Sequence, residues 1–377
     1  MNRLRRVRDD ESGMSYVFIG MGMMAFLSAS MLAIDVGMLM TSRNQAQNAA
    51  DAGALAGATA LFFNDFNDRS AGGPAVTHAI AASKENDVMS VDVSVGPEDV
   101  TFPTSPSGLN NRVQVDVDAT VNTWIARFFK MPTANIVATA TAEASKANAM
   151  TCVKPFTIPD RWIEKHTPGW DASDTFDAFD NKGNPLANPD IYIPADQPGY
   201  TGYSMERDKG TRLMIRAGTG NDITPSFYFS LAIGAVTGGD EYEWNIENCN
   251  TTIMKWGEKL VQEPGNMMGP TVQGAWDLYN KDIGAYWDNS SQTVKGSKFG
   301  RSPRVFPIPL YDPNYYDENK REGRTADLKV ANWIGFFLEE IQGNNIYGRI
   351  TPIAGILDKN AGPAPDYVFP MAIRLVK

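Results

Sequence analysis

Residues 14–34 read MSYVFIGMGMMAFLSASMLAI, a run without any charged side chain, and the apolar character continues past Asp35 to Met40. A helix needs about 20 apolar residues to cross a bilayer, and this run supplies them. The sequence therefore predicts a membrane-spanning helix near the N-terminus. A cleavable signal peptide is the alternative, because residues 28–30 (SAS) could serve as a small-residue cleavage site. The apolar run continues beyond that point, which favours a helix that stays attached.

The charges that flank this run predict its orientation. Arginines stand before it at positions 3, 5, 6 and 8, whereas the far end carries only Arg43 nearby. Lysine and arginine are retained on the cytoplasmic side of a membrane, and acidic residues count for little. We therefore expect residues 1–13 to form a cytoplasmic tail and the bulk of the chain to be periplasmic, held at a bacterial inner membrane by a single-pass anchor.

The helix is expected to continue out of the membrane. Residues 41–62 read TSRNQAQNAADAGALAGATALF, which contains no proline and is rich in alanine, the best helix former. One helix over 14–62 would be roughly 70 Å long. Its outer half carries a face of small residues, namely Ala46, Ala49, Ala50, Gly53, Gly57 and Ala60. Small residues let another backbone approach closely, so this face packs either on the protein's own sheet or against helices of other subunits.

Asp35 is the one acid in the apolar run. Acids inside membrane segments are often functional. This one lies near the predicted outer end, where water and headgroups are close. Two interpretations stay open, an interfacial residue and a contact with a partner helix.

A family resemblance is carried by residues 32–61. The stretch AIDVG at 33–37, followed by QNAADAGALA at 47–56, resembles the N-terminal helix of TadE/TadG-like proteins of the Flp, or tight-adherence (Tad), pilus assembly system. The resemblance implies a non-enzymatic, membrane-anchored envelope component that acts through contacts with other pilus assembly proteins or pilins.

One departure from the pilin branch of that family concerns processing. Pilins and pseudopilins have a glycine cleavage site followed five residues later by glutamate, whereas the fifth residue after Gly13 is Phe18. This difference favours a retained, TadG-type protein. The alternative is a processed minor pilin or pseudopilin that enters the filament.

Composition and patterning describe the rest of the chain. The 377 residues carry 43% hydrophobic and 21% charged residues and a net charge of −10, which is a globular composition without the basic patch that a nucleic-acid partner needs. We predict an α+β protein in which the helix over 14–62 extends into a small pilin-like antiparallel sheet over 63–150. A β-rich, loop-rich exported domain over 151–377 follows.

Period-2 alternation and helical spacing give the expected elements. Strands are expected near 91–95, 113–121 and 138–142 in the first part, and near 213–216, 227–233 and 327–334 in the second. Short helices are expected near 252–261 and 272–280.

The two cysteines, Cys152 and Cys249, both lie beyond the anchor. Two cysteines in an oxidising compartment are readily interpreted as one disulfide; two unrelated buried thiols are the alternative. We predict the disulfide, because no third cysteine competes for pairing.

No catalytic motif stands out in the sequence. It contains no nucleophile elbow, phosphate-binding glycine loop or HExxH, and only two histidines. We therefore predict no enzyme activity, no cofactor and no small-molecule substrate. A membrane-anchored periplasmic hydrolase is a third hypothesis that rests only on the 44 acids. No metal site is predicted; Asp177, Asp180 and Asp190 are calcium candidates on a turn-rich loop, but they lack EF-hand spacing, which favours a solvated acidic turn.

Overall fold

A computed structural model describes residues 12–64, 67–106, 108, 110–166, 170–171, 173–180, 184–218, 222–235, 237–319 and 327–376. Most of the predicted cytoplasmic tail, residues 1–11, lies outside these ranges. The chain divides into two compact units. The first unit comprises residues 1–61, 65–143 and 374–377, and the second comprises 62–64 and 144–373. The predicted division lay near residue 150.

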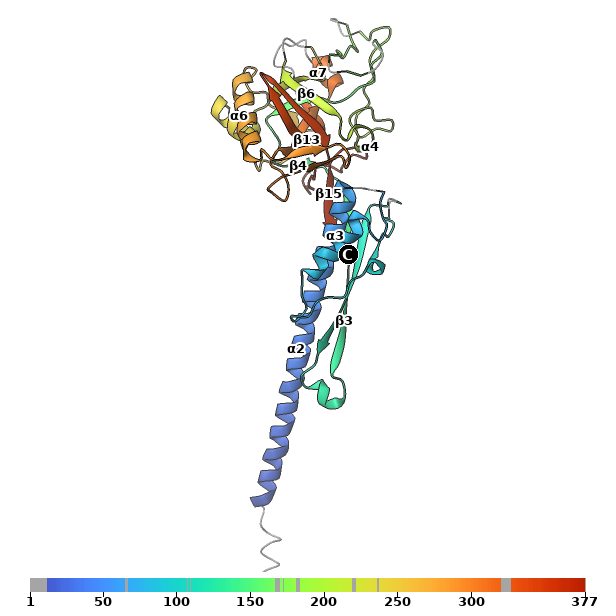
Figure 1. Cartoon of the computed structure of the whole chain (residues 1–377), viewed down its shortest axis with the longest axis vertical. Helices are drawn as coiled ribbons and strands as arrows, with labels where there is room; N and C mark the ends of the chain where they lie inside the picture. Colours follow the sequence, from blue (N-terminus) through green and yellow to red (C-terminus); the bar gives the residue numbers. More distant parts are fainter. Residues whose placement is uncertain are drawn as a thin grey trace, which may run out of the picture. The chain divides into compact units, whose positions relative to one another are not determined.

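The first unit is built on one long helix, as the sequence predicts. Helix α2 (Ser12–Phe63) is continuous, and a hairpin of two long strands runs beside it (Figure 1). The other elements that belong to this unit, wholly or in part, are α3 (Pro74–Lys84), η1 (Pro97–Asp99), β1 (Val100–Thr101), β2 (Arg112–Asn122), η2 (Ala126–Phe129), β3 (Thr133–Lys146) and β15 (Met371–Leu375). Residues 144–146 of β3 and 371–373 of β15 are counted with the second unit. The sheet has the order β1-β2-β3-β15.

The β2–β3 hairpin follows the helix over much of its length. The two strands pair antiparallel from Arg112↔Glu143 to Asn122↔Thr133 without a register shift. Val113 at one end of β2 lies against Gly57 of α2, and the turn just after β2 is bonded to Asp35. The 22 helical residues between Asp35 and Gly57 span about 33 Å and the 11 residues of β2 span about 36 Å. The two lengths agree, so strand and helix advance side by side.

The strand predicted at 91–95 does not form. This stretch makes only isolated bridges, Val88↔Val91 and Ser94↔Asp118, although Val93 and Val95 are buried as the alternation suggests. Two consecutive residues with left-handed backbone, Met89 and Ser90, precede it, and the 3-10 helix η1 begins at Pro97. The run is too short between these breaks to pair along its length.

The second unit contains a sheet that closes on itself. Its order is β12-β5-β7-β6-β14-β13-β9, and β12 also pairs with β13, so six strands from β12 to β13 form a closed barrel. The strands are β5 (Phe156–Pro159), β6 (Arg212–Ala217), β7 (Phe227–Ser230), β9 (Lys259–Leu260), β12 (Val305–Tyr311), β13 (Leu328–Gln342) and β14 (Asn345–Thr351). The pairs β12–β5 and β6–β7 are parallel, and the other neighbouring barrel strands are antiparallel. The predicted strands near 213–216, 227–233 and 327–334 are β6, β7 and β13.

Helices and short strands surround the barrel. They are β4 (Ala149–Met150), α4 (Met205–Asp208), η3 (Ile233–Ala235), α5 (Gly239–Glu247), β8 (Met254–Lys255), α6 (Met268–Lys281), β10 (Tyr286–Asp288), β11 (Thr293–Lys295) and α7 (Pro313–Asn319). Helix α6 contains the helix predicted at 272–280, and its buried face contacts α5 through Gly274. The core of this unit is apolar and aromatic, with Trp333, Phe336 and Ile158 fully buried.

The prediction of a helix at 252–261 is wrong. The stretch forms β8 and β9, which are joined through a turn at Gly257 with φ +75°. Each short strand finds a partner far away in sequence, β4 for β8 and β13 for β9. The side chain of Trp256 donates its indole N–H to the carbonyl of Ala331 at 2.8 Å. Non-local pairing thus outweighs the helical spacing of the apolar residues.

Candidate functional site

Within the described part of the chain, the N-terminal part of α2 is not covered by other elements. Its apolar side chains, such as Tyr16, Phe18 and Phe26, are exposed. Among the described residues, one helix, over Met14–Phe63, is long and apolar enough to cross a membrane. Contact with the rest of the unit begins at Asp35, which is 4% exposed. The bare segment from residue 14 to residue 34 is about 31 Å long, close to the thickness of a bilayer's hydrocarbon core.

Asp35 binds the turn of the β2–β3 hairpin. Its Oδ1 accepts a hydrogen bond from the backbone N–H of Trp124 at 2.9 Å, and its Oδ2 accepts from Ile125 at 2.9 Å and Ala126 at 2.7 Å. These N–H groups open the 3-10 helix η2, whose first amides lack partners within the helix. Asp35 therefore holds the hairpin turn onto α2, a role within its own chain that neither sequence interpretation contained.

The small-residue face of α2 packs within its own unit. Ala46, Ala49 and Ala50 are fully buried. A Cβ atom placed on Gly53 would lie 3.0 Å from the carbonyl oxygen of Ala79 in α3, and one on Gly57 would lie 2.8 Å from Val113. Close approach of α3 and β2 to the helix therefore depends on these glycines. This arrangement favours packing on the protein itself, although the partners are α3 as well as the sheet.

Cys152 and Cys249 form a disulfide in the second unit, with their Cα atoms 4.3 Å apart. The backbone N–H of Cys152 also donates to the carbonyl of Asn250 at 2.9 Å. The bond therefore ties the segment that precedes β5 to the loop that follows α5.

Lys154 lies beside this disulfide in a pocket of about 340 Å³. Its Nζ donates to the carbonyl of Asn248 at 2.7 Å and to that of Asn245 at 3.3 Å. Burial, together with the neighbouring charge of Lys281, lowers the pKa of the Lys154 amine to about 7. Both acceptors are backbone groups close to Cys249, so the lysine reinforces the same connection.

The three calcium candidates do not form one cluster with each other. The carboxylate of Asp180 accepts from the backbone N–H and the side-chain amide of Asn184, at 2.8 and 3.0 Å. Asp190 accepts the backbone N–H of Asp177 at 2.8 Å. Asp180 thus closes a local turn, whereas Asp190 binds the backbone of Asp177. The preference for a solvated acidic turn over a calcium site at these three acids stays a prediction.

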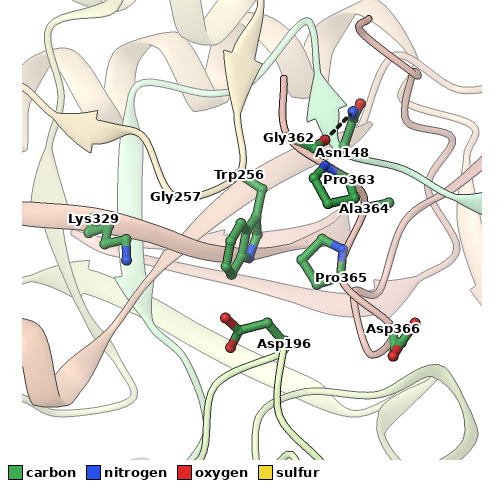
Figure 2. Close-up of a pocket in the computed structure, with 10 residues that line it drawn as sticks. All are labelled: Asn148, Asp196, Trp256, Gly257, Lys329, Gly362, Pro363, Ala364, Pro365 and Asp366. Atoms are coloured by element: carbon green, nitrogen blue, oxygen red, sulfur yellow. Dashed lines mark hydrogen bonds between the residues drawn. The ribbon is translucent and has the colours of Figure 1, made fainter. Parts of the chain in front are cut away.

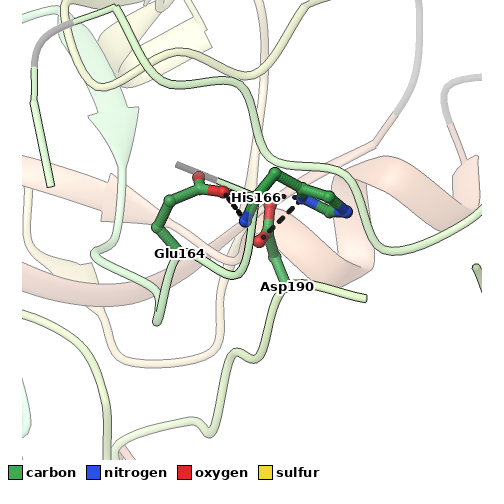
Figure 3. A group of neighbouring side chains, drawn as sticks. All are labelled: Glu164, His166 and Asp190. Atoms are coloured by element: carbon green, nitrogen blue, oxygen red, sulfur yellow. Dashed lines mark hydrogen bonds and ion pairs between the residues drawn. The ribbon is translucent and has the colours of Figure 1, made fainter. Parts of the chain in front are cut away.

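Asp190 lies instead with Glu164 and His166, two residues that the sequence did not single out (Figure 3). One candidate ligand atom from each residue lies within 4.8 Å of the others. His166 Nδ1 is 3.5 Å from Glu164 and 3.4 Å from Asp190. The bridge between Ile163 and Ile191 brings them together, and no local sequence signal announces that pairing.

The electrostatics of this cluster are those of two acids beside one imidazole. The side chains of Glu164 and Asp190 are 5% and 0% exposed, and that of His166 is 39% exposed. Burial, with a contribution from Glu164, raises the pKa of the Asp190 carboxyl. A protonated His166 would balance this negative charge, and the same three groups could hold a cation.

Asp160 is a second buried acid that the sequence did not single out. Its Oδ2 accepts from the hydroxyls of Tyr200 at 2.7 Å and Tyr192 at 3.1 Å. Its Oδ1 accepts from the backbone N–H groups of Tyr203 at 3.0 Å and Arg161 at 2.9 Å. Burial raises the pKa of the Asp160 carboxyl to about 6, even though these hydrogen bonds act in the opposite direction.

A pocket of about 640 Å³ also lies in the second unit (Figure 2). It is lined by Asn148, Asp196, Trp256, Gly257, Lys329, Gly362, Pro363, Ala364, Pro365 and Asp366. Figure 2 shows the carboxylate of Asp196 on the Trp256 side of Pro365 and that of Asp366 on the other side. The two acids do not converge, as a pair for general acid–base hydrolysis would.

The chain is thus an α+β protein with one long apolar helix near its N-terminus. The first unit contains this helix and the β2–β3 hairpin, and the second unit contains the barrel. Residues 13–60 match the family described as putative Flp pilus-assembly TadE/G-like. The match covers nearly all of α2 and ends before α3, so it confirms the family resemblance of the helix and supports a role in Flp pilus assembly. No curated protein and no solved structure matches the chain.

Proposed function

We propose that this chain is a non-enzymatic, membrane-anchored component of a bacterial Tad/Flp pilus assembly machine, of the TadG type. Its N-terminus lies in the cytoplasm, α2 crosses the inner membrane, and both folded units are periplasmic. The observation that carries the proposal is the TadE/G-like match on α2. The exposed apolar segment before Asp35 supports the anchor, because such a surface would be unfavourable in water.

The proposed action is through protein contacts and not through catalysis. Asp196 and Asp366, the acids of the pocket that contains Trp256, do not converge, and the buried acid Asp160 is engaged by tyrosine hydroxyls and backbone amides. Other pilus assembly proteins or pilins are the proposed partners.

Deleting the gene and imaging surface pili tests this function. We expect loss of pili and of surface adhesion, with both restored by the full chain supplied in trans. Normal pili and normal adhesion in the deletion strain would refute the proposal.

A processed minor pilin is the second candidate, since a long helix beside an antiparallel hairpin is also how a pilin is built (Figure 1). N-terminal sequencing of the mature protein distinguishes the two. We expect no cleavage after Gly13, because Phe18 stands where the pilin pattern has glutamate. A new N-terminus at Met14 would favour the minor pilin.

A further inference from the structure

We propose that the turn of the β2–β3 hairpin, residues 123–132, rests in the headgroup layer of the bilayer that α2 crosses and binds anionic phospholipid headgroups there. This inference rests on the proposed anchoring by α2. It adds a second membrane contact to the first unit.

The position of the turn relative to the bilayer follows from its hydrogen bonds to Asp35. The segment before it, residues 14–34, is bare and as long as the hydrocarbon core is thick. Asp35 is the first buried residue among those of α2 whose exposure the structure describes, and it holds the backbone of Trp124, Ile125 and Ala126. When the bare segment spans the core, these hydrogen bonds place the turn at the membrane surface.

The turn is a fixed structure and not a loose loop. The N–H of Thr123 donates to the carbonyl of Pro132 at 3.0 Å, and the N–H of Met131 donates to that of Ala126 at 3.1 Å. Lys130 adopts the left-handed conformation that ends η2. The side chains at its surface are therefore presented in a defined direction.

The exposed side chains of the turn suit a headgroup layer. Trp124 is 67% exposed and Met131 is 58% exposed, and Arg127 and Lys130 are exposed beside them. Tryptophan is enriched at membrane interfaces, where its ring is apolar and its N–H is hydrated. Basic residues near an anionic membrane surface are attracted to it electrostatically.

Local charge and depth together favour an anionic lipid surface as the occupant. Residues 123–132 carry two cations, Arg127 and Lys130, in a chain whose net charge is −10, while Asp35, the acid bonded to the turn, is buried and engaged by backbone N–H groups. Because these hydrogen bonds place the turn at the membrane surface, phospholipid headgroups lie within reach of both cations.

The test places a fluorescent NBD label on single cysteines of the full chain in vesicles of phosphatidylethanolamine and phosphatidylglycerol. The native cysteines are engaged in the disulfide. The labelled variants are Trp124→Cys in the turn, Phe26→Cys in the bare segment, and His78→Cys in α3 as the matched control. His78 is exposed in the same unit and lies next to Ala79, which contacts Gly53 and Gly57, so it is about 30 Å farther along α2 than Asp35.

We expect spin-labelled lipids to quench the labels at positions 26 and 124 but not at 78. A headgroup-level quencher should act more strongly at 124, and a deep-chain quencher more strongly at 26. Replacing phosphatidylglycerol by phosphatidylcholine should reduce quenching at 124 and leave position 26 unchanged.

Two results would overturn the inference, and they differ. If the label at position 26 were quenched and the label at position 124 were as little quenched as that at 78, the lipid contact would be refuted while the anchor stands. The exposed turn would then be a protein-binding surface. Absence of quenching at 26 would refute the anchor itself and the lipid contact with it.

Discussion

The buried acid Asp160 links the stability of the folded protein to pH. The pKa of its carboxyl is about 6 in the folded protein and about 4 when unfolded. Between these values the folded state holds a proton that the unfolded state releases. The stabilisation is therefore fully present below about pH 4 and is lost as the pH rises through about 6. Its size is on the order of 3 kcal/mol.

The variant Asp160→Asn should remove this pH dependence. Its oxygen can still accept from the two backbone N–H groups, and its amide can donate to the hydroxyl oxygens of Tyr192 and Tyr200. Chemical denaturation at pH 4 and pH 7, followed by tryptophan fluorescence, measures the difference from wild type. Asp196→Asn, at an exposed acid, is the matched control and should keep the wild-type slope. Equal slopes for Asp160→Asn and wild type would contradict the role of Asp160.

The sequence predicted which residues contact each other only where a side chain had a single possible partner. Cys152 and Cys249 had no competitor, so a disulfide between them was the expected outcome in an oxidising compartment, and the two form it. Asp35 was singled out as an acid in an apolar run, but its partner amides lie about 90 residues away. His166 meets Asp190 through a single bridge between other residues. No local pattern encodes such contacts.

Among the helices and strands, those with a strong local period were predicted well. Helix α2 is continuous because its sequence has no proline and much alanine, and β2 alternates valines with polar residues along its length. The prediction of a helix at 252–261 was wrong because this stretch forms two short strands, each of which pairs with a strand far away in sequence. Short apolar runs are decided by tertiary contacts that the sequence does not display.

Packing of α2 against α3 and β2 predicts the effect of a larger residue at position 57. A Cβ atom on Gly57 would lie 2.8 Å from Val113 and 3.2 Å from the carbonyl oxygen of Ala75, so Gly57→Val must push the elements apart. Overpacking of this kind costs about 1–3 kcal/mol. Amide hydrogen exchange should show faster exchange in α3 and β2.

The matched control is Gly37→Val in the same helix. Nothing lies within 4 Å of a Cβ atom at that position, so exchange in α3 and β2 should stay at the wild-type rate. If both variants exchanged alike, the glycine would not be what allows the close approach.

The molecule as a whole was predicted as an α+β protein with a long N-terminal helix and a β-rich remainder, which is its class. The closed barrel was not predicted. Closure depends on β12 pairing with both β5 and β13, and β5 and β12 are separated by about 150 residues in the sequence. Local alternation identifies a strand but says nothing about its neighbours, so a ring of strands cannot be inferred from it.

Both cysteines of the disulfide lie in the second unit. Its removal should therefore destabilise that unit and leave the first unit unchanged. The disulfide spans 97 residues of sequence, and closing such a loop should stabilise the folded state by about 4–5 kcal/mol in the chain-entropy model. We expect the double variant Cys152→Ala/Cys249→Ala to lower the unfolding free energy of the barrel unit by that amount. Helix α2 should stay inserted, as measured by resistance to carbonate extraction.

Reduction of the wild-type protein with dithiothreitol provides the control for side-chain effects. It should reproduce the loss of stability, and the same treatment should leave the alanine variant unchanged. Amide exchange at Trp124, Ile125 and Ala126, which are bonded to Asp35, should be slow in every case, since those bonds lie in the first unit. Release of α2 from the membrane, or fast exchange at these amides, would show that the anchor depends on the disulfide and would contradict the independence of the two units.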